Sequence, residues 1–144
     1  MSVTATPYNS FKKKLLDGSN INLASDTIKV SLHTSSYTPN IDSHTVFSDI
    51  TNEVTGTGYS AGGVALANKV VTQDNTNDLA YFDADDASWP SSTIAAARYA
   101  VIRKDTGTAS TSPVIGYVDF GADKATAGDT FLIQWAATGI LKIA

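Results

Sequence analysis

The chain has 144 residues, of which 42% are hydrophobic and only 17% are charged, and its formal net charge is −4. This length makes one domain with a sizeable core, and the acidic balance removes any electrostatic attraction to phosphate backbones, so we expect no nucleic-acid partner. The absence of cysteine excludes disulfides, and no run approaches the roughly 20 apolar residues of a membrane helix. The first residues also lack the apolar stretch of a secretion signal, so we expect synthesis in the cytoplasm and no membrane partner.

The first predicted element is a short helix near the N-terminus. Phe11 and Leu15 lie four residues apart with three lysines between them, which places both on one helical face. Asn9 or Ser10 is the expected cap at its start, and Gly18 is expected to end it.

Residues 1–18 are therefore predicted to form an arm or short helix, followed by a β-sandwich domain at residues 19–144. A helix of this length is marginal on its own and must pack against something. It either closes one end of the sandwich or docks on a neighbouring subunit, where the lysine run would meet an acidic surface.

β-strand patterns follow at regular intervals. Residues 27–32 alternate cleanly, with Ile28, Val30 and Leu32 on one face. Further strand patterns cover residues 64–72, 79–83, 97–104, 114–120, 130–135 and 139–143. Between them, residues 35–43 predict a loop, 45–54 fit a helix or a strand, 56–63 predict a glycine-rich turn and 105–113 predict a hairpin loop. The chain is thus predicted to be all-β, a single β-sandwich or jelly-roll-like domain.

A serine motif in the glycine-rich segment invites a catalytic interpretation. Gly58-Tyr59-Ser60-Ala61-Gly62 matches G-x-S-x-G, the nucleophile elbow of α/β-hydrolases. That chemistry needs an apolar strand before the serine and a helix after it, and neither pattern is present. We expect these glycines to supply positive φ angles in a turn, and we predict no catalytic residues and no enzyme.

Three aspartates close together form the next candidate site. Asp83, Asp85 and Asp86 could bind Ca²⁺ through carboxylate oxygens or act as an acid–base pair. Aspartates at a strand end also cap backbone N–H groups in turns. We favour the turn role, leave a structural cation as the alternative, and assign no metal ligand and no cofactor.

The two histidines, His33 and His44, lack a third ligand at a consistent spacing, so we expect both to be hydrogen-bonded loop or core residues. The aromatic residues are better candidates for contact with a partner. Most lie at alternating strand positions and are expected to be core. Trp89 precedes a proline in a predicted loop and is expected to be an exposed interface anchor.

Five segments, in this order along the chain, carry a resemblance to a known group of proteins. They are residues 26–39 (DTIKVSLHTSSYTP), 56–63 (GTGYSAGG), 82–89 (FDADDASW), 97–102 (ARYAVI) and 115–121 (IGYVDFG). Together they resemble small virion structural proteins of tailed bacteriophages, and the resemblance covers nearly the whole chain. It implies no catalytic residues.

The resemblance implies a capsid decoration, or cement, protein on the outer surface of the virion, with the major capsid protein as its partner. A homo-oligomer is expected, and a trimer suits a threefold site on an icosahedral shell. The alternatives are a tail or fibre component and a module that binds host-surface glycans. A low-charge chain with a single glutamate suits a protein interface. The candidate interface residues are Phe11, Leu15, Tyr37, Tyr59 and Trp89.

Overall fold

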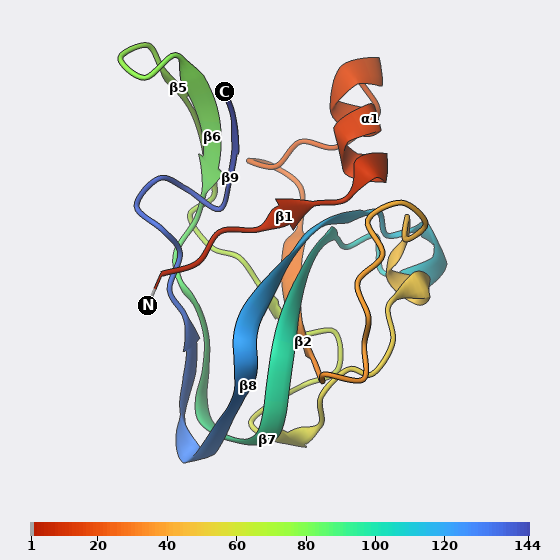
Figure 1. Ribbon diagram of the computed structural model, residues 1–144, viewed down its shortest axis with the longest axis vertical. Helices are drawn as coiled ribbons and strands as arrows, with labels where there is room; N and C mark the ends of the chain where they lie inside the picture. Colours follow the sequence, from red (N-terminus) through yellow and green to blue (C-terminus); the bar gives the residue numbers. More distant parts are fainter. Residues whose placement is uncertain (1) are drawn as a thin grey trace.

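The computed structural model describes residues 2–144, and these residues are 48% strand and 10% helix. The strands are β1 (Thr6–Pro7), β2 (Ile28–His33), β3 (Gly56–Thr57), β4 (Val64–Ala65), β5 (Val70–Asp74), β6 (Leu79–Asp83), β7 (Ala87–Lys104), β8 (Val114–Ile133) and β9 (Leu141–Ile143). The helices are α1 (Asn9–Asp17) and the 3-10 turns η1 (Phe47–Asp49) and η2 (Ala109–Thr111). Two antiparallel sheets and one short helix near the N-terminus confirm the predicted all-β sandwich class (Figure 1).

The larger sheet is built on one long hairpin, β7–β8. Its strand order is β1-β8-β7-β2-β4, and β3 pairs with the first part of β7. The pairing of β7 with β8 shifts register at several points between Trp89 and Tyr99, and such bulges bend a ribbon and increase its twist. Figure 1 shows the consequence, since both strands bend at the bottom of the molecule and run back upward.

The main core lies inside this bend. Ile28, Val30 and Leu32 of β2 are fully buried, as their alternation predicted. The ring centroids of Phe120 and Phe131 lie 5.9 Å apart. These two residues belong to the two limbs of the bent strand β8, so the sheet packs partly against itself, and Phe82 of β6 joins the same core from the smaller sheet.

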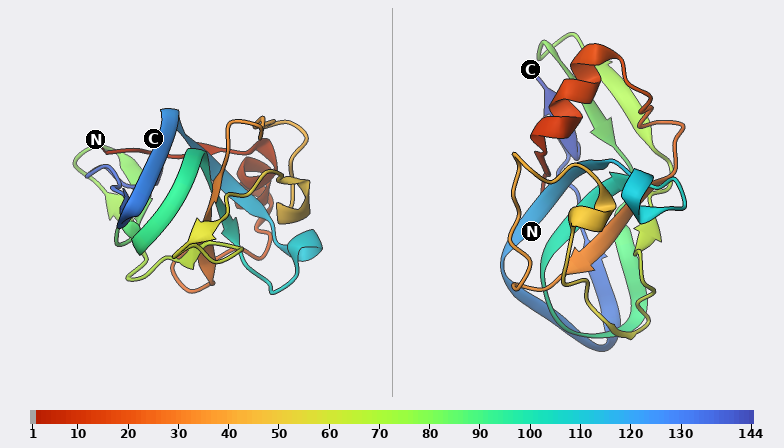
Figure 2. Two further views of the ribbon diagram at one scale, coloured as in Figure 1. Left: turned by 90° about the horizontal axis from the view of Figure 1, so that it is seen from below. Right: turned by 90° about the vertical axis from the view of Figure 1, so that its right-hand side faces the viewer.

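A second, smaller core covers the outer face of the same sheet. The segment 34–54 has little regular structure and crosses this face, as the orange-to-yellow ribbon in Figure 2 shows. It buries Tyr37 against Val101 and Val114, and the hydroxyl oxygens of Tyr37 and Tyr8 lie 2.7 Å apart. The predicted loop at 35–43 is confirmed, and the ambiguous segment 45–54 contains only the single turn η1 between extended residues.

The smaller sheet has the order β5-β6-β9. The single strand predicted at 64–72 is wrong, because this segment divides between the two sheets. Val64–Ala65 pair with β2, whereas Val70–Asp74 pair with β6. The chain changes direction at Asn68, whose φ of 51° lies in the left-handed region that asparagine tolerates better than most residues.

Helix α1 lies at the same end of the molecule as the smaller sheet (Figure 1). Gly18 ends it as predicted, with a φ of 69° and its N–H donated to the carbonyl oxygen of Lys14. The predicted cap at Asn9 or Ser10 is wrong: Tyr8 occupies that position and contributes no side-chain hydrogen bond to the helix. Tyr8 and Phe11 are buried, and this attaches the helix firmly to the body of the protein.

Candidate interaction surface

The structure places Trp89 in the core. The residue lies within β7 and is 2% exposed, so the prediction of an exposed loop anchor is wrong. Its ring stacks on Tyr59 with centroids 5.9 Å apart and meets Phe131 edge-on at the same separation. Strand pairing places Phe131 opposite Trp89, and Tyr59 comes from the turn between β3 and β4, so the Trp89 side chain is not available to a partner.

Two further candidate interface residues make internal hydrogen bonds. The Tyr37 hydroxyl lies 3.0 Å from His44 Nδ1, and burial of the ring raises the pKa of Tyr37 to about 12. The Tyr59 hydroxyl donates to Glu53 Oε1 at 2.6 Å and accepts from the Leu32 N–H at 3.0 Å. Both tyrosines hold loops against the larger sheet.

The remaining two, Phe11 and Leu15, line an open groove. Its volume is about 500 Å³, and it lies between α1 and one face of the small sheet. Leu16 of α1 and Leu23, which follows the helix, complete this side of the groove. The sheet side is formed mainly by Val71, Ala80, Phe82, Leu141 and Ile143. We call this the α1 groove.

Strand pairing explains why the sheet side is apolar. Val71 pairs with Phe82, and Phe82 pairs with Leu141, so these three side chains share one face. Ala80 pairs with Ile143 two positions further along and lies on the same face. An apolar sheet face usually packs against another layer, but here α1 stands apart from it and leaves the groove open.

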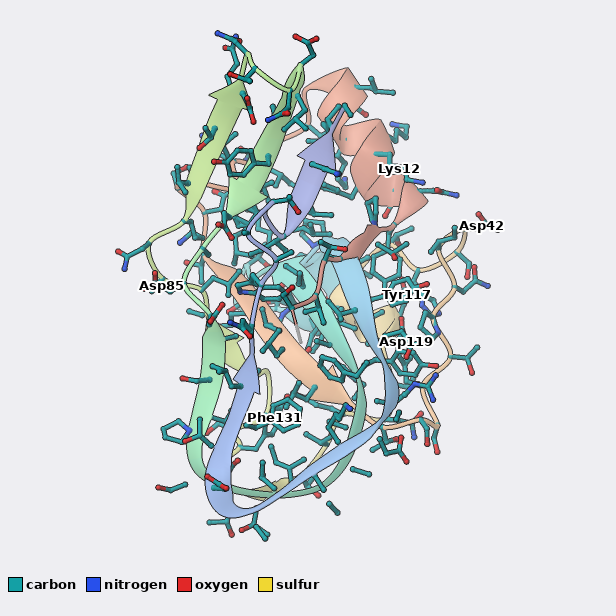
Figure 3. The ribbon with its side chains drawn as sticks, turned by 60° about the vertical axis from the view of Figure 1, so that its left-hand side comes forward. Lys12, Asp42, Asp85, Tyr117, Asp119 and Phe131 are labelled. Atoms are coloured by element: carbon teal, nitrogen blue, oxygen red, sulfur yellow. The ribbon has the colours of Figure 1, made fainter. Side chains whose placement is uncertain are left out.

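The charged side chains among the groove-lining residues are lysines. Lys12 projects from α1 at this end of the molecule (Figure 3), and Lys142 lines the groove from β9. Lys13 pairs with Asp17 across one helical turn at 2.7 Å, on an exposed surface where such a pair contributes little stability. The groove is therefore apolar inside and basic at its rim, although the chain as a whole is acidic.

The aspartate cluster has separate roles. Asp85 accepts from Asn68 Nδ2 at 2.6 Å, and Asp86 Oδ1 accepts from the backbone N–H of Trp135 at 2.9 Å. Asp83 Oδ1 is buried without a hydrogen-bond partner. Across residues 2–144, no three His, Cys, Asp or Glu side chains come close enough together to hold a metal ion. Asp85 and Asp86 thus bond residues 17 and 49 positions away in the sequence and connect separate segments, rather than capping the N–H groups of their own turn as predicted.

The serine motif lies in a turn, as predicted. Gly58 and Gly62 have φ angles of 78° and 92°, which confirms the expected role of these glycines. The carbonyl of Ser60 accepts from the Gly63 N–H at 3.0 Å, and the chain continues into strand β4 rather than a helix. The geometry of a nucleophile elbow is therefore not formed.

His33 is a buried, hydrogen-bonded core residue, as predicted. Its Nδ1 lies 2.8 Å from the carbonyl oxygen of Thr51, so this nitrogen carries the proton, and Nε2 accepts from the Ser31 hydroxyl at 2.9 Å. Burial lowers the pKa of His33 below its ordinary 6.5; the hydrogen bond to Thr51 and the Glu53 carboxylate oppose this in part, and the cation Arg103 adds a smaller lowering.

This lowered pKa predicts a loss of stability in mild acid. As the pH falls from about 7 to about 5, the unfolded chain binds a proton at His33 that the folded chain resists, so the free energy of unfolding decreases. Above the ordinary pKa neither state is protonated and the contribution is fully present. Urea unfolding of the parent and of His33→Gln across this range should show a flatter pH dependence for the variant. Equal slopes would contradict the prediction.

The protein is thus an all-β protein with an open apolar groove, the α1 groove, at the end that carries helix α1. Within residues 2–144, no helix is long and apolar enough to cross a lipid bilayer. Comparison of the chain with protein-family models, with curated proteins and with solved structures finds no match.

The sequence predicted the helical side of the α1 groove but not its sheet side. The helical spacing of residues 11 and 15 predicted that they share a face. Val71 and Ile143 lie on short strands, and only their pairing with β6 shows that they join the same surface. Leu16 is 90% exposed and lines the groove beside Leu15, so it belongs to a cluster of exposed apolar side chains that only the folded structure reveals.

Proposed function

We propose that this protein is a structural component of a bacteriophage virion, a capsid decoration protein that binds the outer surface of the capsid and stabilises the shell. The observation that carries the proposal is the α1 groove, a preformed apolar surface on a rigid β-fold. The five sequence segments that resemble small virion proteins support it independently. The expected partner is the major capsid protein, and the expected state is a homo-oligomer, with a trimer favoured.

Rigidity is what such a role requires. A decoration protein adds buried interface at the junctions between capsid subunits, and a flexible body would lose part of that free energy to ordering. Here the sheet folds over its own core, and a second core fixes the long segment 34–54. Apolar surface on such a body is available for binding at little conformational cost.

The competing role of a host-glycan binding module is less well supported. Sugar recognition by stacking needs exposed aromatic rings, and the rings of Tyr37 and Trp89 are 1% and 2% exposed. A tail or fibre location that uses the α1 groove for protein contact remains the alternative to the capsid.

Cosedimentation with purified capsids that lack the protein tests the proposal. We expect saturable binding, with a copy number that matches a set of symmetry-related sites, and a higher temperature for shell disruption after binding. A protein that stays in the supernatant at every concentration, while capsids remain equally heat-sensitive, would refute the capsid role. Binding to isolated tails in the same assay would favour the alternative.

A further inference from the structure

The exposed apolar residues of this protein are concentrated rather than scattered. Among residues 2–144 six large hydrophobic side chains are exposed, and four of them line the α1 groove. These four are Leu15 (42% exposed), Leu16 (90%), Val71 (53%) and Ile143 (61%). Single exposed apolar residues are common on protein surfaces, but a cluster around a groove indicates a surface that another molecule covers.

The form of the groove favours a macromolecule over a small ligand. A pocket for a small molecule encloses most of its ligand, so its lining residues are largely shielded from solvent. Leu16 and Ile143 instead stand at the edges and remain mostly exposed. Only a partner that extends beyond the groove itself can cover them.

The charge at the rim indicates the character of that partner. Lys12 and Lys142 line the groove, and none of the side chains that line it is acidic. The Lys12 ammonium donates to Asn9 Oδ1 at 3.0 Å and has no carboxylate as its hydrogen-bond partner. A partner segment with apolar side chains and flanking carboxylates would bury the leucines and meet the ammonium groups. Such complementarity selects a partner and increases the association rate more than it increases affinity.

A second copy of this chain fits the same surface poorly. In a symmetric pair, each groove would face the other, and the basic rims would be brought together. Like charges opposed across an interface disfavour that arrangement. The charge pattern therefore disfavours a symmetric dimer formed through this surface.

We infer that the α1 groove binds an acidic segment with apolar side chains, supplied by the partner protein. This inference rests on the proposed function, in which that segment belongs to the surface of the major capsid protein. The leucines of α1 and the apolar face of the small sheet take up its hydrophobic side chains, and the lysines of α1 and β9 meet its carboxylates.

Matched substitutions test the inference on capsids that lack the protein. Leu16→Asp removes apolar surface and adds a repelling charge, and Lys12→Glu reverses one rim charge; each should weaken binding at least about tenfold. The controls are Leu132→Asp and Lys124→Glu, an exposed leucine and an exposed lysine on β8 that do not line the groove. Both controls should bind as the parent does. If the parent binds and the groove variants bind equally well, the inference is overturned while the proposed function stands.

A second measurement decides the inference even if the parent does not bind capsids, an outcome that would refute the proposed function alone. A short peptide of alternating leucine and glutamate is titrated into isotope-labelled protein and followed by NMR. Amide shifts should be confined to the elements that line the groove, namely α1, the segment around Leu23, β5, β6 and β9, and the corresponding leucine–lysine peptide should cause much smaller shifts. Equal shifts with both peptides, shifts elsewhere, or none would overturn the inference. A change of oligomeric state in Leu16→Asp would overturn it too, in favour of a second copy.

Discussion

Replacing Gly63 with alanine should abolish stable folding, whereas the same change at Gly107 should be tolerated. A Cβ atom at Gly63 would lie 1.8 Å from the carbonyl oxygen of Val30, and φ there is +76°. The clash is with the backbone of the central strand β2, which cannot move without breaking its pairing with β7. We expect a loss of more than about 4 kcal/mol, beyond the range of most single substitutions.

Gly107 is the matched control. Its φ of +88° imposes the same conformational strain on alanine, but nothing lies within 4 Å of the added Cβ. Strain alone should cost about 1–2 kcal/mol. Urea unfolding followed by circular dichroism compares the two variants, and a loss of similar size in both would show that β4 does not approach β2 as closely as described.

Trp89→Ala should lower the free energy of unfolding by about 3–5 kcal/mol, the range observed for removal of large aromatic side chains from cores. Trp89 packs between Tyr59 and Phe131, and its indole N–H is buried without a hydrogen-bond partner. The whole loss therefore comes from packing. Trp89→Phe retains much of the ring contact and should lose less than half as much.

The same pair of variants separates the core role of Trp89 from the role of a surface anchor. Urea unfolding gives the stability of each, and binding of the folded fraction to capsids gives its contribution to the interface. A Trp89→Ala protein with parental stability but lost binding would contradict the core assignment. Trp135, the other tryptophan, remains as a fluorescence probe in both variants.

Local alternation was enough to predict several strands closely. The expected strands 27–32 and 79–83 correspond to β2, in which apolar and polar residues alternate, and to β6, which is a short apolar run. The expected strands 97–104 and 130–135 proved to be parts of much longer ones. The missing part of β8, residues 121–130, is mostly exposed and rich in Gly, Ala, Asp and Thr, so no buried face marks it as strand.

The burial of Trp89 could not be predicted locally. A tryptophan followed by proline and two serines has the composition of a loop, and its burial depends on the pairing of β7 with β8, which places Phe131 directly opposite it, and on the packing of Tyr59 against its ring. The α1 groove has the same origin. Its sheet side joins residues 71, 80–82 and 141–143, which are brought together only by the pairing of β6 with its two neighbours, and its other side comes from residues 11, 12, 15 and 16 of α1.

Cryo-electron microscopy of capsids decorated with the purified protein tests the central claim most directly. We expect regular density at symmetry-related positions on the outer shell. Helix α1 and strand β9 should face the capsid protein, and an acidic segment of that protein should lie in the α1 groove. Bare shells, or decorated shells on which this groove points into solvent, would contradict it.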